Sequence, residues 1–225
     1  MHIEPGIVDG AKMALGYATA VGVLGYTAKL AWGTVKRDGV ARLGVRSLMA
    51  ALMVFCFFQV LPHAPVGVSE VHLILGSTLF LVFGPAAAAI GLGLGLLTQG
   101  LFFAPADLPQ YGMNVTTLLV PLFALSAVAA RIIPEKTAYK DVSYKQCLAL
   151  STTYQAGIVT WVAFWAVYGQ GVGAGNLYEI GAFGMAYMAV ILIEPLVDLG
   201  VLAAAKTLRG FDTSKVFHGR LYNAA

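Results

Sequence analysis

Residues 71–104 read VHLILGSTLFLVFGPAAAAIGLGLGLLTQGLFFA and contain no Asp, Glu, Lys or Arg. A helix that crosses a membrane needs about 20 apolar residues, because each residue rises 1.5 Å and the hydrocarbon layer is about 30 Å thick. This stretch is therefore too long for one crossing. Pro85 follows Gly84 near its middle, and proline breaks a helix because it lacks the backbone donor and disfavours helical backbone before it. We therefore expect two short helices, over residues 71–84 and 86–104.

Outside this stretch, the chain offers five more apolar runs of membrane-spanning length. They cover residues 11–35, 43–61, 114–131, 146–168 and 178–205. Apolar residues make up 59% of the chain and charged residues 11%, whereas a soluble domain is about 45–50% apolar and about 25% charged. A soluble fold of this length has too little interior for so much apolar side chain, which excludes a cytosolic enzyme, a disordered tail and a nucleic-acid binder. The sequence predicts one all-α, polytopic membrane domain over residues 1–225, with seven spans.

The basic residues gather in three clusters whose placement predicts the orientation of the chain. The clusters are Lys36, Arg37, Arg42 and Arg46; Arg131, Lys136, Lys140 and Lys145; and Lys206, Arg209, Lys215 and Arg220. With seven spans, all three lie on one side, and lysine and arginine mark the cytoplasmic side. We therefore expect a multi-pass protein of the cell inner membrane, with an external N-terminal segment over residues 1–10 and a cytoplasmic tail over residues 206–225.

The sequence lacks the common motifs of hydrolases and nucleotide-binding proteins. It has no H-E-x-x-H, no G-x-S-x-G and no P-loop, the patterns that bind a catalytic zinc, expose a serine nucleophile or hold phosphates. An intramembrane enzyme is therefore the least favoured hypothesis. We expect a protein that is not an enzyme and that needs partner subunits for any ATP-driven step.

The chain begins Met1-His2-Ile3, and this opening has the chemistry of a metal chelate. We expect Met1 to be retained, because aminopeptidase removes it only ahead of small residues. The Met1 amine, with a reference pKa of about 7.7–8.0, and the His2 amide can close one ring on a metal, and the His2 amide and imidazole can close a second. Three nitrogens in one plane suit Ni(II) or Cu(II). The alternative is that His2 is an unstructured terminal residue.

A fourth nitrogen would complete the square, and two histidines on the same expected side can supply it. We expect His72 to begin the third span on the external side, directly after residues 62–70. The alternative for His72 is a plain interfacial position at the start of that helix. His63 is the competing ligand, but it follows a proline in a loop, so its position is less fixed.

Five short motifs follow one another along the chain. They are M-H-I-x-x-G at residues 1–6, H-L at 72–73, G-P-x-A-A at 84–88, Q-x-L-F-F at 99–103 and G-x-N at 112–114. In these motifs and their spacing, the chain resembles the membrane substrate-binding subunit of cobalt and nickel transporters of the energy-coupling-factor type, the CbiM/NikM family.

The resemblance implies a metal held by the Met1 amine, the His2 amide and imidazole, and His72, under a loop that follows the second span. It implies supporting positions for Gln99 and Asn114, for which the alternative is an interhelical hydrogen bond without metal contact. The ion, Ni(II) or Co(II), is then the transported substrate, and no permanently bound cofactor is implied.

The resemblance also implies the function and its partners. The chain would capture the ion outside the cell for an ATP-driven importer. Its partners would be a coupling transmembrane protein, two ATPase subunits, a small accessory membrane protein and the lipid bilayer. The alternative is a structural or accessory membrane subunit of a larger complex without metal transport, which is favoured if His2 and His72 lie far apart.

Three charged residues lie deep inside the expected spans, away from their ends. Glu194 and Asp198 are four residues apart in the last span, so they share a helix face. Lys29 in the first span and Asp198 both lie about 10 Å from the inner surface at 1.5 Å per residue. Unpaired charges are costly at that depth, so we expect Lys29 to pair with Asp198 or Glu194. The alternative is a contact surface or an ion path.

Overall fold

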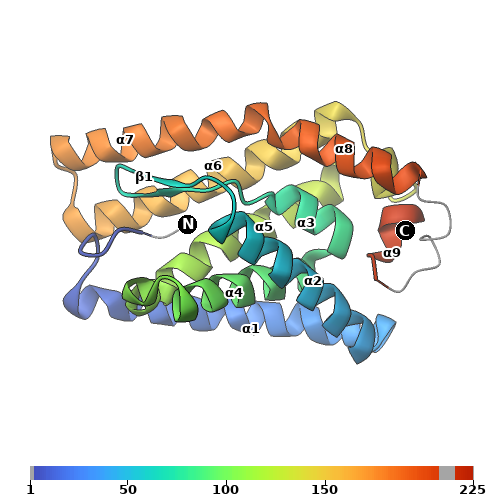
Figure 1. Cartoon of the computed structure of the whole chain (residues 1–225), viewed down its shortest axis with the longest axis horizontal. Helices are drawn as coiled ribbons and strands as arrows, with labels where there is room; N and C mark the ends of the chain where they lie inside the picture. The colour runs from blue at the N-terminus through green and yellow to red at the C-terminus, as the bar shows by residue number, and fades with distance from the viewer. Residues whose placement is uncertain (1–2, 208–215, 225) are drawn as a thin grey trace.

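The computed structural model describes residues 3–207 and 216–224, and helices dominate it (Figure 1). The helices are η1 (Gly10–Lys12), α1 (Met13–Asp38), α2 (Val40–Gln59), α3 (Gly76–Phe83), α4 (Pro85–Phe102), η2 (Pro105–Gln110), α5 (Tyr111–Ile132), η3 (Tyr139–Asp141), α6 (Tyr144–Gln170), α7 (Ala174–Met188), η4 (Ala189–Leu192), α8 (Glu194–Thr207) and α9 (Gly219–Tyr222). Two short strands, β1 (Ala64–Val66) and β2 (Ser69–Val71), form an antiparallel hairpin. The predicted all-α class is confirmed.

Five helical segments are long and apolar enough to cross a membrane. They are Val40–Gln59, Pro85–Phe102, Pro105–Ile132, Tyr144–Gln170 and Ala174–Thr207. The helix α1 has 26 residues, which at 1.5 Å per residue also exceeds the thickness of the hydrocarbon layer. These lengths confirm a polytopic membrane protein. The number of crossings and the side on which each terminus lies stay predictions.

The prediction of a helix over residues 71–84 is wrong in length and in starting point. The helix α3 covers only Gly76–Phe83, and eight residues rise about 12 Å, too little to cross a membrane. Helix cannot begin earlier, because Val71 pairs within the hairpin and Leu75 adopts a left-handed backbone with φ 55°. All of α3 is buried, so it is a short internal helix and no crossing by itself.

The break between the third and fourth helices lies where the sequence predicts it. Gly84 has a φ of 81°, and Pro85 is the first residue of α4. Glycine adopts a positive φ without a steric cost because it has no Cβ. Proline is tolerated at the first helical position because the N–H there has no partner within the helix.

The helix α4 packs very close to α2. A Cβ atom on Gly91 would overlap with Ala50, and one on Gly95 would overlap with Val54. Both partners in α2 are fully buried. Glycine at these positions lets the two backbones approach. With α5 against α4, and α3 in contact with α4, α5, α6 and α8, the centre of the bundle is filled.

The N-terminal segment pairs with the hairpin through an isolated β-bridge. Ile3 forms an antiparallel bridge with Ser69, and the N–H of Glu4 donates to the carbonyl of Val68 at 3.3 Å. The buried Ile3 side chain packs in a small apolar cluster that includes Met113 of α5. Burial of one isoleucine is worth about 1.5–3 kcal/mol, so this anchor fixes the segment against the bundle.

Residues 216–224 lie at the other end of the bundle from the hairpin (Figure 1). The N–H of His218 donates to the carbonyl of Val82 in α3 at 2.8 Å. That carbonyl is one of the last four of its helix, which have no partner within the helix. Leu221 of α9 is buried in the main core, and Arg220 donates to two carbonyls in the loop after α5. The segment thus covers the end of α3.

Candidate metal centre

His72 lies between β2 and α3 and does not begin a helix, contrary to the prediction. Its side chain is fully buried, and its Nε2 lies 2.9 Å from Oε2 of Glu70. A carboxylate accepts the hydrogen bond, so Nε2 carries a proton. In metal sites, a carboxylate placed in this way fixes the tautomer and the orientation of a ligand histidine.

Glu70 was not predicted as a site residue. It is the middle residue of β2, and in extended chain residues two apart point to the same side. The side chains of Glu70 and His72 therefore lie on the same side of the chain. The sequence signal was Glu-x-His, but this spacing is informative only once the residues before His72 are known to be extended.

His63 lies beside His72. The two rings stack with centroids 4.9 Å apart and planes 13° apart, and Phe58 of α2 packs on the His72 ring at 5.1 Å. His63 is exposed and His72 is buried. The two histidine candidates are therefore close together, with His72 the enclosed one.

Asn114, near the start of α5, reaches the N-terminal segment. It is buried, and its Oδ1 accepts a hydrogen bond from the backbone N–H of Ile3 at 2.9 Å. Ile3 directly follows His2 in the chain, while Met1 and His2 themselves lie outside the described residues. Asn114 therefore fixes the backbone one residue from the predicted chelate.

Gln99, the other supporting residue predicted, is buried in α4. Its Oε1 has no hydrogen-bond partner among the described residues. Its role at the site stays a prediction. Within residues 3–207 and 216–224, no three His, Cys, Asp or Glu side chains are grouped so as to hold a metal ion.

The surroundings of His72 are acidic. Burial raises the pKa of Glu4, and the nearby carboxylates of Glu70 and Asp107 raise it further. These three side chains come from the N-terminal segment, β2 and η2. Carboxylates gathered in this way create a negative potential that attracts cations.

Glu194 and Asp198 are both buried, as their shared face of α8 predicts. Hydroxyl and amide groups donate to them. The donors are Ser77 (3.1 Å), Ser151 (2.6 Å) and Gln155 (2.5 Å) to Glu194, and Thr78 (2.5 Å) to Asp198. The cluster therefore links α8 to α3 and α6 through neutral donors.

The predicted pairing of Lys29 with these carboxylates is wrong. In the described part of the chain, Lys29 forms no ion pair, and its Nζ lies 6.0 Å from the ring centroid of Tyr26. The helices α1 and α8 run along opposite sides of the bundle (Figure 1). Equal depth in the membrane therefore does not bring their charges together.

Comparisons with known proteins agree with the fold. A sequence model of the family described as "Cobalt uptake substrate-specific transmembrane region", CbiM, matches residues 2–210. A crystal structure of a transition metal transporter is similar with a TM-score of 0.69 at 19% identity, covering 92% of this chain and 93% of that one. A truncated transition metal transporter gives 0.64 at 19% identity, covering 92% and 97%.

At this identity, the two structures show a shared fold alone. A search of curated proteins found no match. The family match is the stronger finding, because it covers nearly the whole chain, including the N-terminal segment, the hairpin and α3–α5. The chain belongs to the CbiM family and is a membrane component for metal uptake.

Proposed function

We propose that this chain is the substrate-capture component of an ATP-driven energy-coupling-factor importer for divalent nickel or cobalt. The ion binds at the external side through the Met1 amine, the His2 amide and imidazole, and His72. One observation carries the proposal, the antiparallel bridge between Ile3 and Ser69. Because the pair is antiparallel, we expect residues before Ile3 to run beside the residues that follow Ser69. His2 directly precedes Ile3, and His72 comes three residues after Ser69, so both predicted ligands are close to the bridge in the sequence.

The neighbours of His72 support a cation as the ligand. Glu70 accepts from Nε2, and a carboxylate in this position orients a metal-ligating histidine, so Nδ1 is the ligand atom that we propose. Glu4 and Asp107 add negative charge nearby. Nitrogen ligands in one plane suit a square-planar ion, and affinity alone favours copper over both nickel and cobalt. Cellular supply and partner proteins therefore select the transported ion.

Release inside the cell requires that the nitrogen ligands separate. Gly6 has a φ of 90° and follows Pro5, whereas the next residues are anchored to α6. The Nζ of Lys12 donates to the carbonyl of Gly169 at 2.7 Å, and the backbone of Ile7 packs directly on Gly169. A hinge at residues 5–6 would free the ligands while residues 7–12 stay in place.

The energy for this movement comes from partners in the proposed complex. These are a coupling transmembrane protein, two ATPase subunits and a small accessory membrane protein, all at the cell inner membrane. The chain itself has no P-loop, so it contributes the metal site and the moving segment.

The test compares the metal content of two forms of the purified full chain after loading with nickel or cobalt. One has the native N-terminus, and the other carries several uncleaved residues before Met1. The extension keeps His2 and His72 but removes the terminal amine. Near-stoichiometric metal in the native form and its loss from the extended form is the expected result. Equal metal in both would refute the amine ligand, and none in either would favour a structural subunit.

A further inference from the structure

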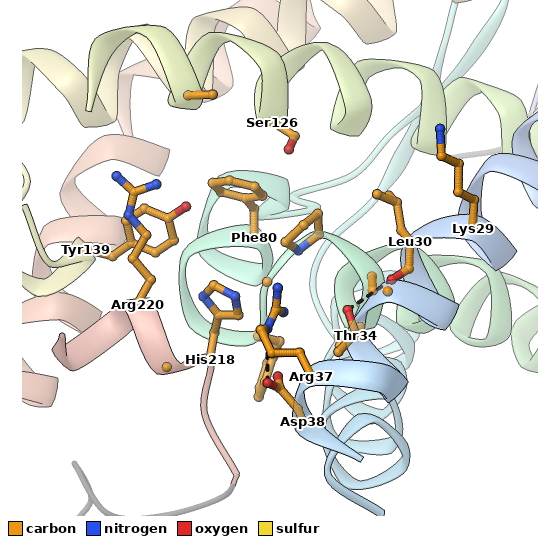
Figure 2. Close-up of a pocket in the computed structure, with 18 of the residues that line it drawn as sticks. Lys29, Leu30, Thr34, Arg37, Asp38, Phe80, Ser126, Tyr139, His218 and Arg220 are labelled. Carbon is orange, nitrogen blue, oxygen red and sulfur yellow. Dashed lines mark hydrogen bonds and ion pairs between the residues drawn. The ribbon is translucent and has the colours of Figure 1, made fainter. Parts of the chain in front are cut away.

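A cavity of about 690 Å³ lies between α1, the junction of α3 and α4, α5 and residues 216–224 (Figure 2). Its volume is within the range of about 300–1,000 Å³ that is usual for ligand pockets. Part of the lining is apolar, with Leu30, Phe80 and Phe83, and part is basic. The cavity therefore fits an amphiphilic ligand, and it lies far from the hairpin that carries His72.

Cationic side chains outnumber acidic ones in the lining. Lys29 and Arg37 come from α1, and Arg220 comes from α9. Among the described lining residues, Asp38 is the one acid, and it already bonds to Arg37 at 3.1 Å and to the buried Arg46 at 2.7 Å. The lining therefore carries an excess of positive charge.

Two further features agree with a positive potential at the cavity. Figure 2 shows the His218 ring beside Arg37. Burial lowers the pKa of His218 to about 4, and the positive charges of Arg46, Arg37 and Arg220 act in the same direction. The first turn of α4 also lines the cavity, with no acidic residue and no side-chain cap. The N–H groups at a helix start carry partial positive charge.

Lys29 is an exposed lysine at one edge of the cavity, apart from Arg37 and Arg220 (Figure 2). It lies nine residues before the end of α1, which is about 13 Å along the helix, and it lines the cavity. A lysine inside a span is costly without a partner. No carboxylate among residues 3–207 and 216–224 forms an ion pair with it.

We propose that this cavity binds an anionic phospholipid, with the phosphate near Arg37 and Arg220, an acyl chain along Leu30 and Phe80, and Lys29 at the opposite edge of the cavity (Figure 2). Basic pockets between membrane helices bind anionic headgroups through charge-assisted hydrogen bonds, which are stronger than neutral ones. The bound lipid would also touch residues 216–224 and so hold that segment on the bundle. The site is independent of the metal centre.

The test uses the full chain in nanodiscs of phosphatidylcholine with a minority of phosphatidylglycerol, followed by mild extraction and native mass spectrometry of the retained lipid. We expect the wild type to retain phosphatidylglycerol selectively. The double variant Lys29→Gln/Arg220→Gln should retain it at least tenfold more weakly, the factor that corresponds to about 1.4 kcal/mol. Arg131→Gln, an exposed arginine outside the lining, is the matched control and should retain it unchanged.

A second variant keeps every charge. Ala130 is exposed and lines the cavity, so Ala130→Trp should fill the space and abolish selective retention without disturbing the core. Equal retention by the wild type and both variants would overturn the proposal. So would an increase in melting temperature with inorganic phosphate in phosphatidylcholine nanodiscs without retention of phosphatidylglycerol, because the ligand would then be a soluble anion.

Discussion

A single hydrogen bond of 2.9 Å joins the backbone N–H of Ile3 to Oδ1 of Asn114, 111 positions away in the chain. It connects the N-terminal segment to α5, while the bridge to Ser69 connects the same residue to the hairpin. Two separate elements thus determine the position of the backbone beside His2. The backbone that leads to the predicted metal ligands is therefore held by tertiary contacts at Ile3.

Asn114→Ala should weaken metal binding. Removing the acceptor leaves the buried N–H of Ile3 without its partner, which costs about 1–3 kcal/mol and favours detachment of the segment. We expect about a tenfold increase in the dissociation constant for nickel by isothermal titration calorimetry. Thr98→Ala, which removes an exposed hydroxyl bonded within its own helix, is the control. Unchanged affinity in Asn114→Ala would show that the segment is held without this bond.

Glu70→Ala should weaken binding through His72. The carboxylate orients the imidazole and fixes its tautomer, and loss of such a partner typically costs 10–100-fold in metal affinity. Glu70→Gln retains an acceptor oxygen, so it should recover part of the affinity. Nickel affinity by calorimetry, with melting temperature measured in parallel, tests this. Full affinity in Glu70→Ala would mean that His72 either is oriented by other contacts or does not bind the metal.

A cross-link between the N-terminal segment and the hairpin should block uptake and spare binding. Gly6→Cys and Pro65→Cys, in a background with the exposed Cys56 replaced by alanine, can be joined by a cleavable reagent. We expect cells to lose nickel accumulation, while the purified protein keeps its metal. Cleavage of the reagent should restore uptake. Unimpeded uptake in the cross-linked protein would contradict a hinge at residues 5–6.

Glu194→Leu should destabilise the bundle. It leaves the hydroxyls of Ser77 and Ser151 and the amide of Gln155 without their buried acceptor, at about 1–3 kcal/mol for each group. The melting temperature in detergent should fall by several degrees. Glu179→Leu, on an exposed position of α7, is the control and should change it little. Lost metal binding with an unchanged melting temperature would instead assign Glu194 to the metal path.

Acidification should release residues 216–224. The pKa of His218 is about 4 in the docked segment and about 6.5 in an unstructured chain. The undocked state therefore binds more protons between these values, and docking weakens as pH falls from about 6.5 toward 4. A spin label at Asn223→Cys should become more mobile over this range. His218→Gln should remove the pH dependence, and a label equally immobile at pH 4 and 7 would contradict the prediction.

The long apolar helices and the break at Gly84–Pro85 could be predicted because both are local properties of the sequence. Twenty apolar residues in a row leave few alternatives to a membrane helix, and Gly-Pro interrupts a helix wherever it occurs. The close approach of α4 to α2 at Gly91 and Gly95 is likewise favoured by the local sequence, since glycine permits close contact of helices.

The hairpin and the partners of the charged residues could not be predicted, because they depend on the path of distant elements. Residues 69–71 are extended only because they pair with residues 64–66 and with Ile3. The sequence gives the depth of Lys29 from the number of residues to the end of its helix. It does not show on which side of the bundle each helix lies. The helices α1 and α8 lie on opposite sides, which separates Lys29 from Glu194 and Asp198.

The contact between His218 and Val82 has a consequence for synthesis. A membrane chain is made from its N-terminus, and its parts fold as they emerge. The carbonyl of Val82 receives its donor only when a residue more than one hundred positions later has been made. The last turn of the short helix α3 therefore lacks this donor until residue 218 has been made, and a chain truncated before residue 216 would be a sensitive substrate for quality-control proteases.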